Sequence, residues 1–480
     1  MKAGPHGLAF SVLYKVTNIS QSVRIKNMKT KKLDMTHGPL LGKLIIFTIP
    51  IILSGVLQLL FNAADVIVVG RFAGEASLAA VGSTGSLINL MTNLFIGMSV
   101  GANVCAAQFY GAGNEEDVKK TVHTSTAFSM ICGVVLIFIG LFGARPMLEL
   151  MGSPDQVLGL ATLYVRLYFL AMPAIMLYNF LAAILRASGD TSHPLIFLTI
   201  AGIVNVLFNL VLVIVFKLGV AGVAIATVTS NYISCGMLVS FLMKQHSSLR
   251  LELSKIAIDK RILKKIVKIG LPAGIQGTVF SLSNVVIQSA INSFGTAVIA
   301  GSSAAASIEG FVYISMNSVS QTTVTFVGQN YGAGNEKRVR KVIFETLGIV
   351  TIVGVVMGNL AYAFAPQLLG IYTDSADAIA AGTLRLFWVC CFYFLCGIMD
   401  TLTGGLRGLG NSTLPMVVSL IGACASRLIW IATYFHSHHT QDVLFFSYPG
   451  SWLLTLSVHS ICLIIIYHKW VNKKKSEIRI

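Results

Sequence analysis

The sequence predicts an all-α integral membrane protein with twelve transmembrane helices in two pseudo-symmetric halves of six. Charged residues make up only 11% of the 480 residues and hydrophobic residues 55%, whereas a soluble domain carries about 25% charged residues. Several apolar runs reach the roughly 20 residues that a membrane-spanning helix needs. These spans must be helical, because lipid cannot satisfy unpaired backbone groups.

The two halves are predicted by an internal repeat. Three landmarks recur at nearly the same spacing, which is too long for a solenoid, whose repeats run roughly 20 to 50 residues. A duplication of six spans therefore gives parallel repeats, related by an axis along the membrane normal. The matched pairs are Gln108–Glu115 with Gln329–Glu336 (offset 221), Leu185–Pro194 with Leu406–Pro415 (offset 221) and Lys43–Pro50 with Lys265–Pro272 (offset 222).

Apolar runs place the spans along the chain. Pro194 and Pro415 fall in the first turn of the fifth and eleventh spans, where a missing N–H costs nothing. Pro50, Pro173 and Pro272 fall inside spans, where we expect kinks. The twelve predicted spans are Leu44–Val69, Ser77–Phe109, Thr121–Leu141, Leu158–Leu185, Leu195–Phe216, Val220–Met243, Ile266–Ile291, Ala304–Gly328, Val342–Phe364, Ile379–Leu406, Met416–Tyr434 and Trp452–Trp470.

Basic residues predict the orientation. They gather in the segments that lie inside if the N-terminus is cytoplasmic, and the predicted outer loops hold few, so both termini are expected to be cytoplasmic. The net charge of +16 therefore indicates contact with anionic lipid rather than nucleic acid. We expect a disordered basic tail (1–36), an N-terminal half (37–243), a linker (244–265), a C-terminal half (266–470) and a second basic tail (471–480).

Four oxygen-bearing side chains are predicted to converge in the outer half of the N-terminal bundle. Asp65 lies about 6 Å inside the outer end of the first span, and Asn209 and Thr227 lie roughly 10–12 Å from theirs. Asn205 projects from the same helix face as Asn209. These oxygens suit H⁺ or Na⁺, and burial favours the neutral form of a carboxyl group. The alternative is that Asp65 simply pairs with Arg166 at similar depth.

In the C-terminal half, Glu309 and Arg385 fall at similar depth, which favours a structural ion pair. Asp400 faces no obvious cation and corresponds to Asn179 at the 221 offset, and an unpaired carboxylate in the membrane is more often functional than not. The eighth span is too polar to face lipid and is expected to line a central cavity. Further candidate cavity residues are Gln276, Asn284, Tyr313 and Asn317.

The segment Asp65–Gly70, together with both Tyr-Gly-Ala-Gly-Asn-Glu turns and both Leu-Arg-x-x-Gly-x-x-x-x-Pro turns, resembles the multidrug and toxic compound extrusion (MATE) family of the MOP flippase superfamily. The resemblance covers nearly everything from Leu40 to Lys475. It implies a V-shaped pair of six-helix lobes. It also implies export of organic cations driven by inward H⁺ or Na⁺.

The resemblance also assigns roles to individual residues. Asp65 matches the first-helix cation aspartate, Asn205 and Asn209 match a fifth-helix polar pair, Thr227 matches a sixth-helix hydroxyl, and Asp400 matches the tenth-helix acidic residue of one branch. Two features depart from the pattern. Some members carry aspartate where Asn209 stands, and others carry an acidic residue in the seventh helix, where the segment 276–291 has none.

These observations lead us to expect a secondary active exporter that exchanges organic cations for H⁺ or Na⁺ by rocking of the two lobes. We expect a monomer in a bacterial inner membrane, surrounded by lipid, without a nucleic acid partner, metal or cofactor. All eight cysteines lie in apolar runs and are interpreted as small hydrophobic residues without disulfides. The two glycine-rich turns lack a following Lys-Ser or Lys-Thr and are interpreted as tight turns rather than phosphate-binding loops.

Two alternatives remain open at this stage. A flippase for lipid-linked sugars or peptidoglycan precursors would need an electropositive cavity, which Arg166 and Arg385 favour and Glu309 and Asp400 oppose. An integral-membrane enzyme would need a catalytic group. The histidine cluster in the last outer loop is the candidate for a metal, although a solvated, incidental cluster fits better: His436, His438 and His439.

Overall fold

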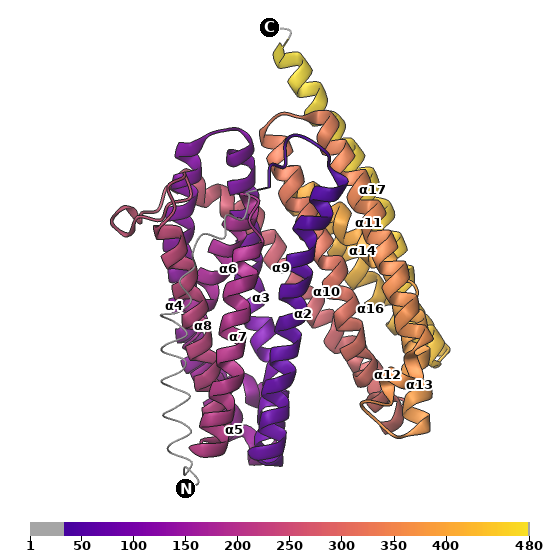
Figure 1. The fold of residues 1–480 in the computed structure, drawn as a ribbon. Coiled ribbons are helices and arrows are strands. Elements are labelled where there is room, and N and C mark those ends of the chain that lie inside the picture. Colours follow the sequence, from indigo (N-terminus) through magenta and orange to yellow (C-terminus); the bar gives the residue numbers. More distant parts are fainter. Residues whose placement is uncertain (1–32, 479–480) are drawn as a thin grey trace.

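The computed structural model describes residues 33–478 and is helical throughout (Figure 1). Within that range, ten single helices are long and apolar enough to cross a membrane, and two bent helix pairs bring the number of spans to twelve. The helices are α2 (Leu41–Phe72), α3 (Glu75–Gly111), α4 (Glu115–Leu150), α5 (Asp155–Phe169), α6 (Met172–Ala187), α7 (Ser192–Leu210), α8 (Gly219–Met243), α9 (Lys260–Asn292), α10 (Thr296–Gly332), α11 (Glu336–Ala363), α12 (Ala365–Leu369), α13 (Ala376–Cys390), α14 (Tyr393–Gly408), α15 (Thr413–Ser419), α16 (Ser426–Trp430) and α17 (Gln441–Ile478).

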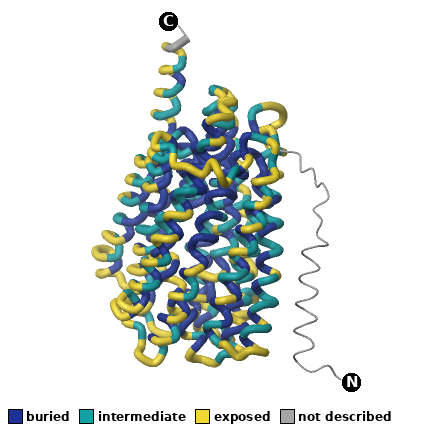
Figure 2. Tube along the Cα trace, turned by 90° about the vertical axis from the view of Figure 1, so that its left-hand side faces the viewer, coloured by how far each residue is buried: buried dark blue, intermediate teal, exposed yellow. Residues whose placement is uncertain are grey.

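Helices α2–α8 form an N-lobe and α9–α17 form a C-lobe. The lobes meet at one end, which holds the turns after α3 and α10, and they diverge toward the other, so the expected V-shaped pair of lobes is confirmed (Figure 1). We call these the closed end and the open end. Buried positions concentrate inside the bundle (Figure 2). Large apolar side chains such as Phe142 and Ile352 remain 74% and 66% exposed on its outside, as a lipid-facing surface requires.

Two predicted spans are not single helices. The pair α5 and α6 bends by 47°, and the pair α13 and α14 by 40°. Pro173 lies in the first turn of α6, where a proline can kink the span. Its counterpart at the 221 offset is Phe394, so the second bend forms without a proline. Both breaks face a glycine of the preceding long helix. A Cβ on Gly133 would lie 2.4 Å from the Cα of Pro173, and one on Gly354 would lie 2.7 Å from that of Phe394.

The most extensive contact between the lobes joins α3 to α9. Each helix carries two glycines four residues apart, and a Cβ on Gly101 would lie 2.1 Å from the Ile266 carbonyl oxygen. Likewise, a Cβ on Gly97 would lie 2.3 Å from the Cα of Gly274. Small residues at this spacing let two helix backbones approach within the membrane. The C-lobe is therefore anchored on the N-lobe through its first helix.

The repeated glycine turns close the interface at the closed end. A Cβ on Gly111 would lie 1.9 Å from the Gln329 carbonyl oxygen, and a Cβ on Gly332 would lie 1.9 Å from that of Gln108. Each glutamine then donates its side-chain amide across the interface, to Gly408 O (2.9 Å) and Ala187 O (2.6 Å). Gly113 and Gly334 follow with φ of +68° and +67°, so the tight-turn interpretation is confirmed.

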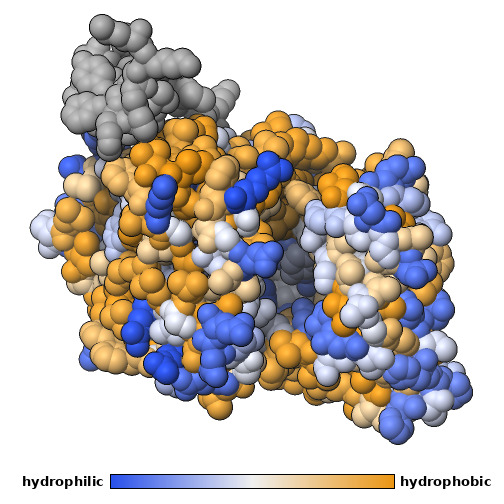
Figure 3. Space-filling view, turned by 90° about the horizontal axis from the view of Figure 1, so that it is seen from below, coloured by the Kyte–Doolittle hydropathy of each residue, from blue (hydrophilic) through white to orange (hydrophobic). Residues whose placement is uncertain are grey.

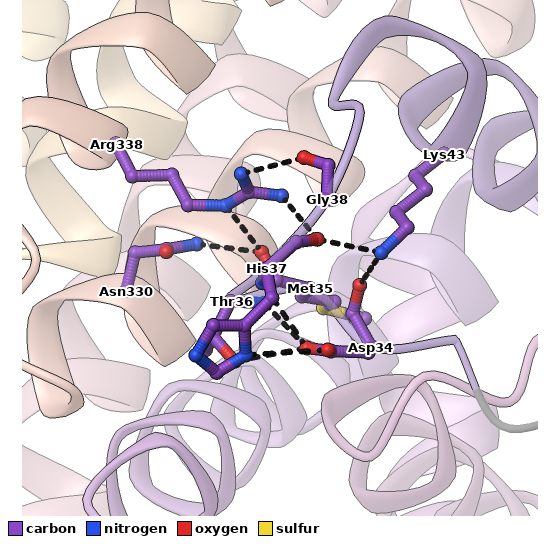
Figure 4. Close-up of polar contacts among 8 residues, drawn as sticks. All are labelled: Asp34, Met35, Thr36, His37, Gly38, Lys43, Asn330 and Arg338. Carbon is purple, nitrogen blue, oxygen red and sulfur yellow. Dashed lines mark hydrogen bonds and ion pairs between the residues drawn. The ribbon is translucent and has the colours of Figure 1, made fainter.

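A strap of residues 33–38 crosses the closed end before α2 begins (Figure 4). The guanidinium of Arg338 holds it to the C-lobe through three backbone carbonyls, those of Met35 (2.9 Å), Gly38 (2.9 Å) and His37 (3.0 Å). The Met35 side chain is fully buried. The end of the segment that we expected to be a disordered tail is therefore packed, while residues 1–32 lie outside the described range.

The strap also touches the N-lobe. Gly189 has a φ of +96°, and a Cβ there would lie 2.6 Å from the Leu33 carbonyl oxygen. Burial raises the pKa of Asp34, but hydrogen bonds from Thr36 and His37 and the charge of Lys43 outweigh this effect and hold that pKa at about 2. Asp34 therefore keeps its charge at neutral pH and orders the turn that enters α2.

We expect Gly101→Ala to destabilise the protein by about 1–3 kcal/mol, because the added methyl group must displace the backbone of α9. The matched control is Gly85→Ala on the same helix, where a Cβ would have nothing within 4 Å. Thermal unfolding of detergent-solubilised protein, followed by labelling of the buried Cys105, measures both. Equal melting temperatures for the two variants would contradict the packing argument.

We expect Arg338→Ala to release the strap from the C-lobe, because three carbonyls lose their donor at once. Hydrogen exchange of the amides of residues 33–38 should rise in this variant. Arg340→Ala is the control, because Arg340 lies over the Phe344 ring (5.6 Å) rather than on the strap. Unchanged exchange in Arg338→Ala would show that the apolar contacts of Met35 alone hold the segment.

Candidate cation site and substrate cavity

The four polar residues predicted in the N-lobe do converge. The Nδ2 atom of Asn209 donates to an oxygen of Asp65 and lies 3.3 Å from Asn205 Oδ1. Asn205 Nδ2 lies 3.4 Å from Thr227 Oγ1, and the Thr227 hydroxyl also contacts the carboxyl group of Asp65. All four side chains are buried. Three helices, α2, α7 and α8, therefore supply one connected cluster.

The sequence of α7 explains why these side chains meet. Asn205 and Asn209 are one turn apart on α7, so both amides face the same neighbour. Gly202 lies one turn earlier, and a Cβ there would lie 1.8 Å from the Phe61 ring of α2, so a larger residue would have to displace that ring. A π-helical turn, Val211–Val215, begins just after Asn209. Such turns are frequent at functional sites.

The cluster contains no basic group. Arg166, the alternative partner of Asp65, instead donates Nε to the Leu141 carbonyl oxygen (3.0 Å) on an exposed surface, so that pairing is wrong. Within residues 33–478 no ion pair involves Asp65, and the buried Oδ1 of Asn209 accepts no hydrogen bond there. A carboxyl group with amide and hydroxyl oxygens is an arrangement that binds a proton or a hard cation such as Na⁺.

The predicted ion pair in the C-lobe is confirmed. Arg385 on α13 donates Nε and Nη2 to the two carboxylate oxygens of Glu309 on α10, at 2.7 and 2.8 Å. Both residues are buried, and the guanidinium also lies 5.9 Å from the Phe445 ring centroid. This two-point contact neutralises both charges.

A C-lobe chamber of about 670 Å³ lies between α3 and the helices of the C-lobe. The predicted residues Glu309, Asp400, Asn284 and Tyr313 line it. Arg427 lines it too and was not predicted. Its guanidinium donates Nε to Ser451 Oγ (2.7 Å) and lies 4.5 Å from the Tyr448 ring centroid, while its buried Nη2 has no hydrogen-bond partner among the described residues.

A central chamber of about 390 Å³ lies between the two lobes, lined by α2, α3, α6 and α7 on one side and by α10 and α14 on the other. The predicted residues Asn179 and Asn317 line it, and so do Arg186 and Arg407. Helix α10 lines both chambers, as its polar face suggested. From the open end, a hollow bordered by hydrophilic residues is visible between the lobes (Figure 3).

Two predictions about this region need correction. Gln276 lines neither chamber, because it is buried in helix packing, where it donates to Ser419 Oγ (3.1 Å) and accepts from Arg407 Nη2 (2.8 Å). Asp400 does have a cationic neighbour, since Arg407 acts on it electrostatically from two turns along α14. The repeat at offset 221 marked Arg186 and Arg407 in the sequence, but spacing alone did not reveal that they share a chamber.

Twelve spans in two pseudo-symmetric lobes around a polar inter-lobe cavity define the class of two-lobed membrane transporters. The MatE family model matches residues 50–211 and again residues 272–430, once in each half. The chain therefore belongs to the MATE family. This double match also follows the internal repeat.

Named relatives and solved structures agree with this assignment. The chain is 29% identical to "Probable multidrug resistance protein YoeA" of Bacillus subtilis (strain 168), over 91% of this chain and 95% of the relative. It is 26% identical to "Probable multidrug resistance protein YpnP" of the same organism, over 84% and 89%. A solved multidrug resistance MATE transporter in an outward-facing conformation has the same fold, with a TM-score of 0.85 at 20% identity over 93% of this chain and 100% of that chain.

We expect Glu309→Gln to destabilise the protein by about 3–5 kcal/mol, because it leaves the buried charge of Arg385 without its partner. The double variant Glu309→Gln with Arg385→Met should recover most of this loss, since no buried charge remains. Thermal unfolding in detergent compares the two. A double variant no more stable than the single one would show that the pair acts through packing rather than charge.

Proposed function

We propose that this protein is a secondary active exporter that exchanges amphiphilic organic compounds for inward H⁺ or Na⁺. The observation that carries the proposal is the buried oxygen cluster around Asp65, which has no cationic partner in the described chain. A buried carboxyl group without a counter-charge gains most from binding a proton or a cation. Membership of a family whose named relatives are multidrug resistance proteins supports the export role.

Ion and substrate would bind at separate places. None of the four cluster residues lines the C-lobe chamber or the central chamber. Coupling between them then requires that ion binding favour one arrangement of the lobes over the other. The exchange is therefore indirect, and it acts through the conformation of the lobes rather than through competition for one site.

Helix α2 is the element that would transmit this preference. Near the closed end it packs into the C-lobe, where Phe47 meets the Phe326 ring at 5.3 Å and Thr48 bonds to Thr322 (2.8 Å). Toward the open end, the same helix carries Asp65 into the N-lobe cluster. A change in α2 caused by ion binding at Asp65 would thus act directly on the interface between the lobes.

The C-lobe chamber would accept the substrate. Asp400 supplies a carboxylate, and Tyr313, Tyr393 and Trp452 supply aromatic rings. Rings and a carboxylate suit lipophilic organic cations without fine shape selection. With the lobes joined at the closed end, this arrangement corresponds to an outward-facing state if both termini are cytoplasmic. We place the protein, as a monomer, in a bacterial inner membrane with that orientation.

The particular residues that favoured the two alternative functions do not support them. For the lipid-linked sugar flippase, Arg166 lies on an exposed surface and Arg385 is neutralised by Glu309. For the membrane enzyme, the histidine cluster is engaged in packing: His439 bonds to Ser293 (2.8 Å) and His438 stacks on Tyr434. Arg186 and Arg407 nevertheless give the central chamber, whose described lining has no aspartate or glutamate, the positive charge that the flippase needs, so the flippase stays the second candidate function.

Efflux of ethidium from energised cells tests the proposal. We expect Asp65→Asn to reduce the efflux rate roughly tenfold or more, because the amide cannot take up a proton and loses the charge that binds Na⁺. Asp155→Asn, at the start of α5 and outside both chambers, is the matched control. Efflux that follows the proton gradient without Na⁺ assigns H⁺ coupling, and efflux that appears only with Na⁺ assigns Na⁺.

An Asp65→Asn protein that reaches the membrane and exports ethidium at the wild-type rate would overturn the role of the cluster. Absence of efflux for every cation tried with the wild-type protein would overturn the exporter itself. The flippase would then be the function to test next.

A further inference from the structure

The internal repeat places one arginine from each lobe at the same central chamber. Arg186 lies in the last turn of α6 and Arg407 in the last turn of α14, and they are related by the 221-residue offset that relates the two halves. Both are half-buried, and both line the chamber of about 390 Å³ between the lobes. Two guanidinium groups from pseudo-equivalent positions therefore face one space.

These charges are not balanced inside the chamber. Among the described residues that line it there is no aspartate or glutamate. The guanidinium of Arg186 makes no hydrogen bond or ion pair with residues 33–478, and Arg407 makes one hydrogen bond, to Gln276, while its buried Nε has no partner there. Asp400 acts on Arg407 from the neighbouring chamber, which leaves Arg186 without a counter-charge.

Such an arrangement is unusual inside a membrane protein unless it binds something. Both arginines lie at the ends of their spans nearest the closed end and line a cavity between the lobes, where charged side chains tend to pair with one another or to mark the path of a substrate. Carbonyl groups at the C-terminus of a helix partly stabilise a nearby cation. They do not supply hydrogen-bond acceptors to the guanidinium N–H groups that face the chamber. Guanidinium groups present paired N–H donors that match a carboxylate or phosphate in two-point contacts.

We propose that Arg186 and Arg407 form an anion-binding site for a carboxylate or phosphate group on the transported molecule. The central chamber is continuous in its lining with the C-lobe chamber, because Ile96 and Gly97 line both. An amphoteric molecule can thus place its anionic group between the two arginines and a cationic group toward Asp400. This inference rests on the proposed export function and narrows its substrate class to compounds that carry an anionic group.

The site is also connected to the closed end. Gln108 and Gln329 donate hydrogen bonds across the interface to the carbonyl oxygens of Gly408 and Ala187. These two acceptors directly follow Arg407 and Arg186 in the chain. An anion held between Arg186 and Arg407 would therefore link the two lobes beside the bonds that keep this end shut. Its departure would leave two guanidinium groups without an anion in the same chamber.

Equilibrium binding of two matched dyes to the purified full-length protein tests the site. Rhodamine B carries a free carboxylate, and its ethyl ester has the same ring system without that anion. We expect Arg186→Gln and Arg407→Gln each to weaken rhodamine B binding about tenfold or more and to leave ester binding within about twofold, measured by fluorescence anisotropy. Arg186→Lys and Arg407→Lys, which keep the charge but cannot make the two-point contact, should bind rhodamine B more tightly than the glutamine variants and less tightly than the wild type.

Equal loss of affinity for both dyes in the glutamine variants would overturn the proposal, because it indicates a structural role. Unchanged affinity for both dyes in these variants would also overturn it. So would lysine variants that bind rhodamine B no better than the glutamine variants. Binding in detergent needs no ion gradient, so it can be present or lost independently of ethidium efflux, and Asp155→Asn, which lies outside both chambers, should bind both dyes normally. A failure of the anion site is thereby distinguished from a failure of ion-coupled export.

Competition identifies the source of the anion. Inorganic phosphate and short-chain phosphatidylglycerol are each added against rhodamine B bound to the wild-type protein. Displacement by phosphate supports a soluble anion as ligand, and displacement by the lipid alone supports a headgroup. Displacement by neither would count against an anion site.

Discussion

The structure depends on one close contact, the packing of α3 against α9. Glycines 97, 101, 270 and 274 let the two backbones approach to a distance that no side chain would permit. This contact fixes the first helix of the C-lobe on the N-lobe. The repeated turns then complete the closure with two cross-lobe glutamine bonds. Since the lobes are held at only one end, they diverge at the other, and the cavity between them follows from this geometry.

Helix α2 gives the second constraint, because it belongs to both lobes. Its beginning lies in the C-lobe core, held by the strap of residues 33–38, and its other end carries Asp65 into the N-lobe. A helix fixed at both ends cannot change at one of them without effect on the other. This arrangement offers a physical route between the buried Asp65 cluster and the interface between the lobes.

The distribution of charge separates structural groups from candidate functional ones. Glu309 and Arg385 neutralise each other in a two-point ion pair and so contribute a fixed element to the C-lobe. Asp65, Asp400 and Arg186 have no such partner within the described chain. Buried charges without partners are where binding of an ion or a substrate changes the free energy most. The C-lobe chamber is lined by both carboxylates and arginines, whereas the described lining of the central chamber holds arginines and no carboxylate.

The sequence by itself determined the number of spans, the duplication and the pairing of Glu309 with Arg385, while for Asp65 it left both the polar cluster and Arg166 as partners at similar depth. The depth of a residue within a predicted span can be calculated from the sequence, because each residue of a helix advances about 1.5 Å. Only the tertiary structure decided which direction each group faces. It turned Arg166 outward, packed Gln276 away from the cavity, broke the tenth span without a proline and brought Arg186 and Arg407 to one chamber. The rotation of a helix about its axis is fixed by the side chains of its neighbours, and those neighbours are distant in the chain.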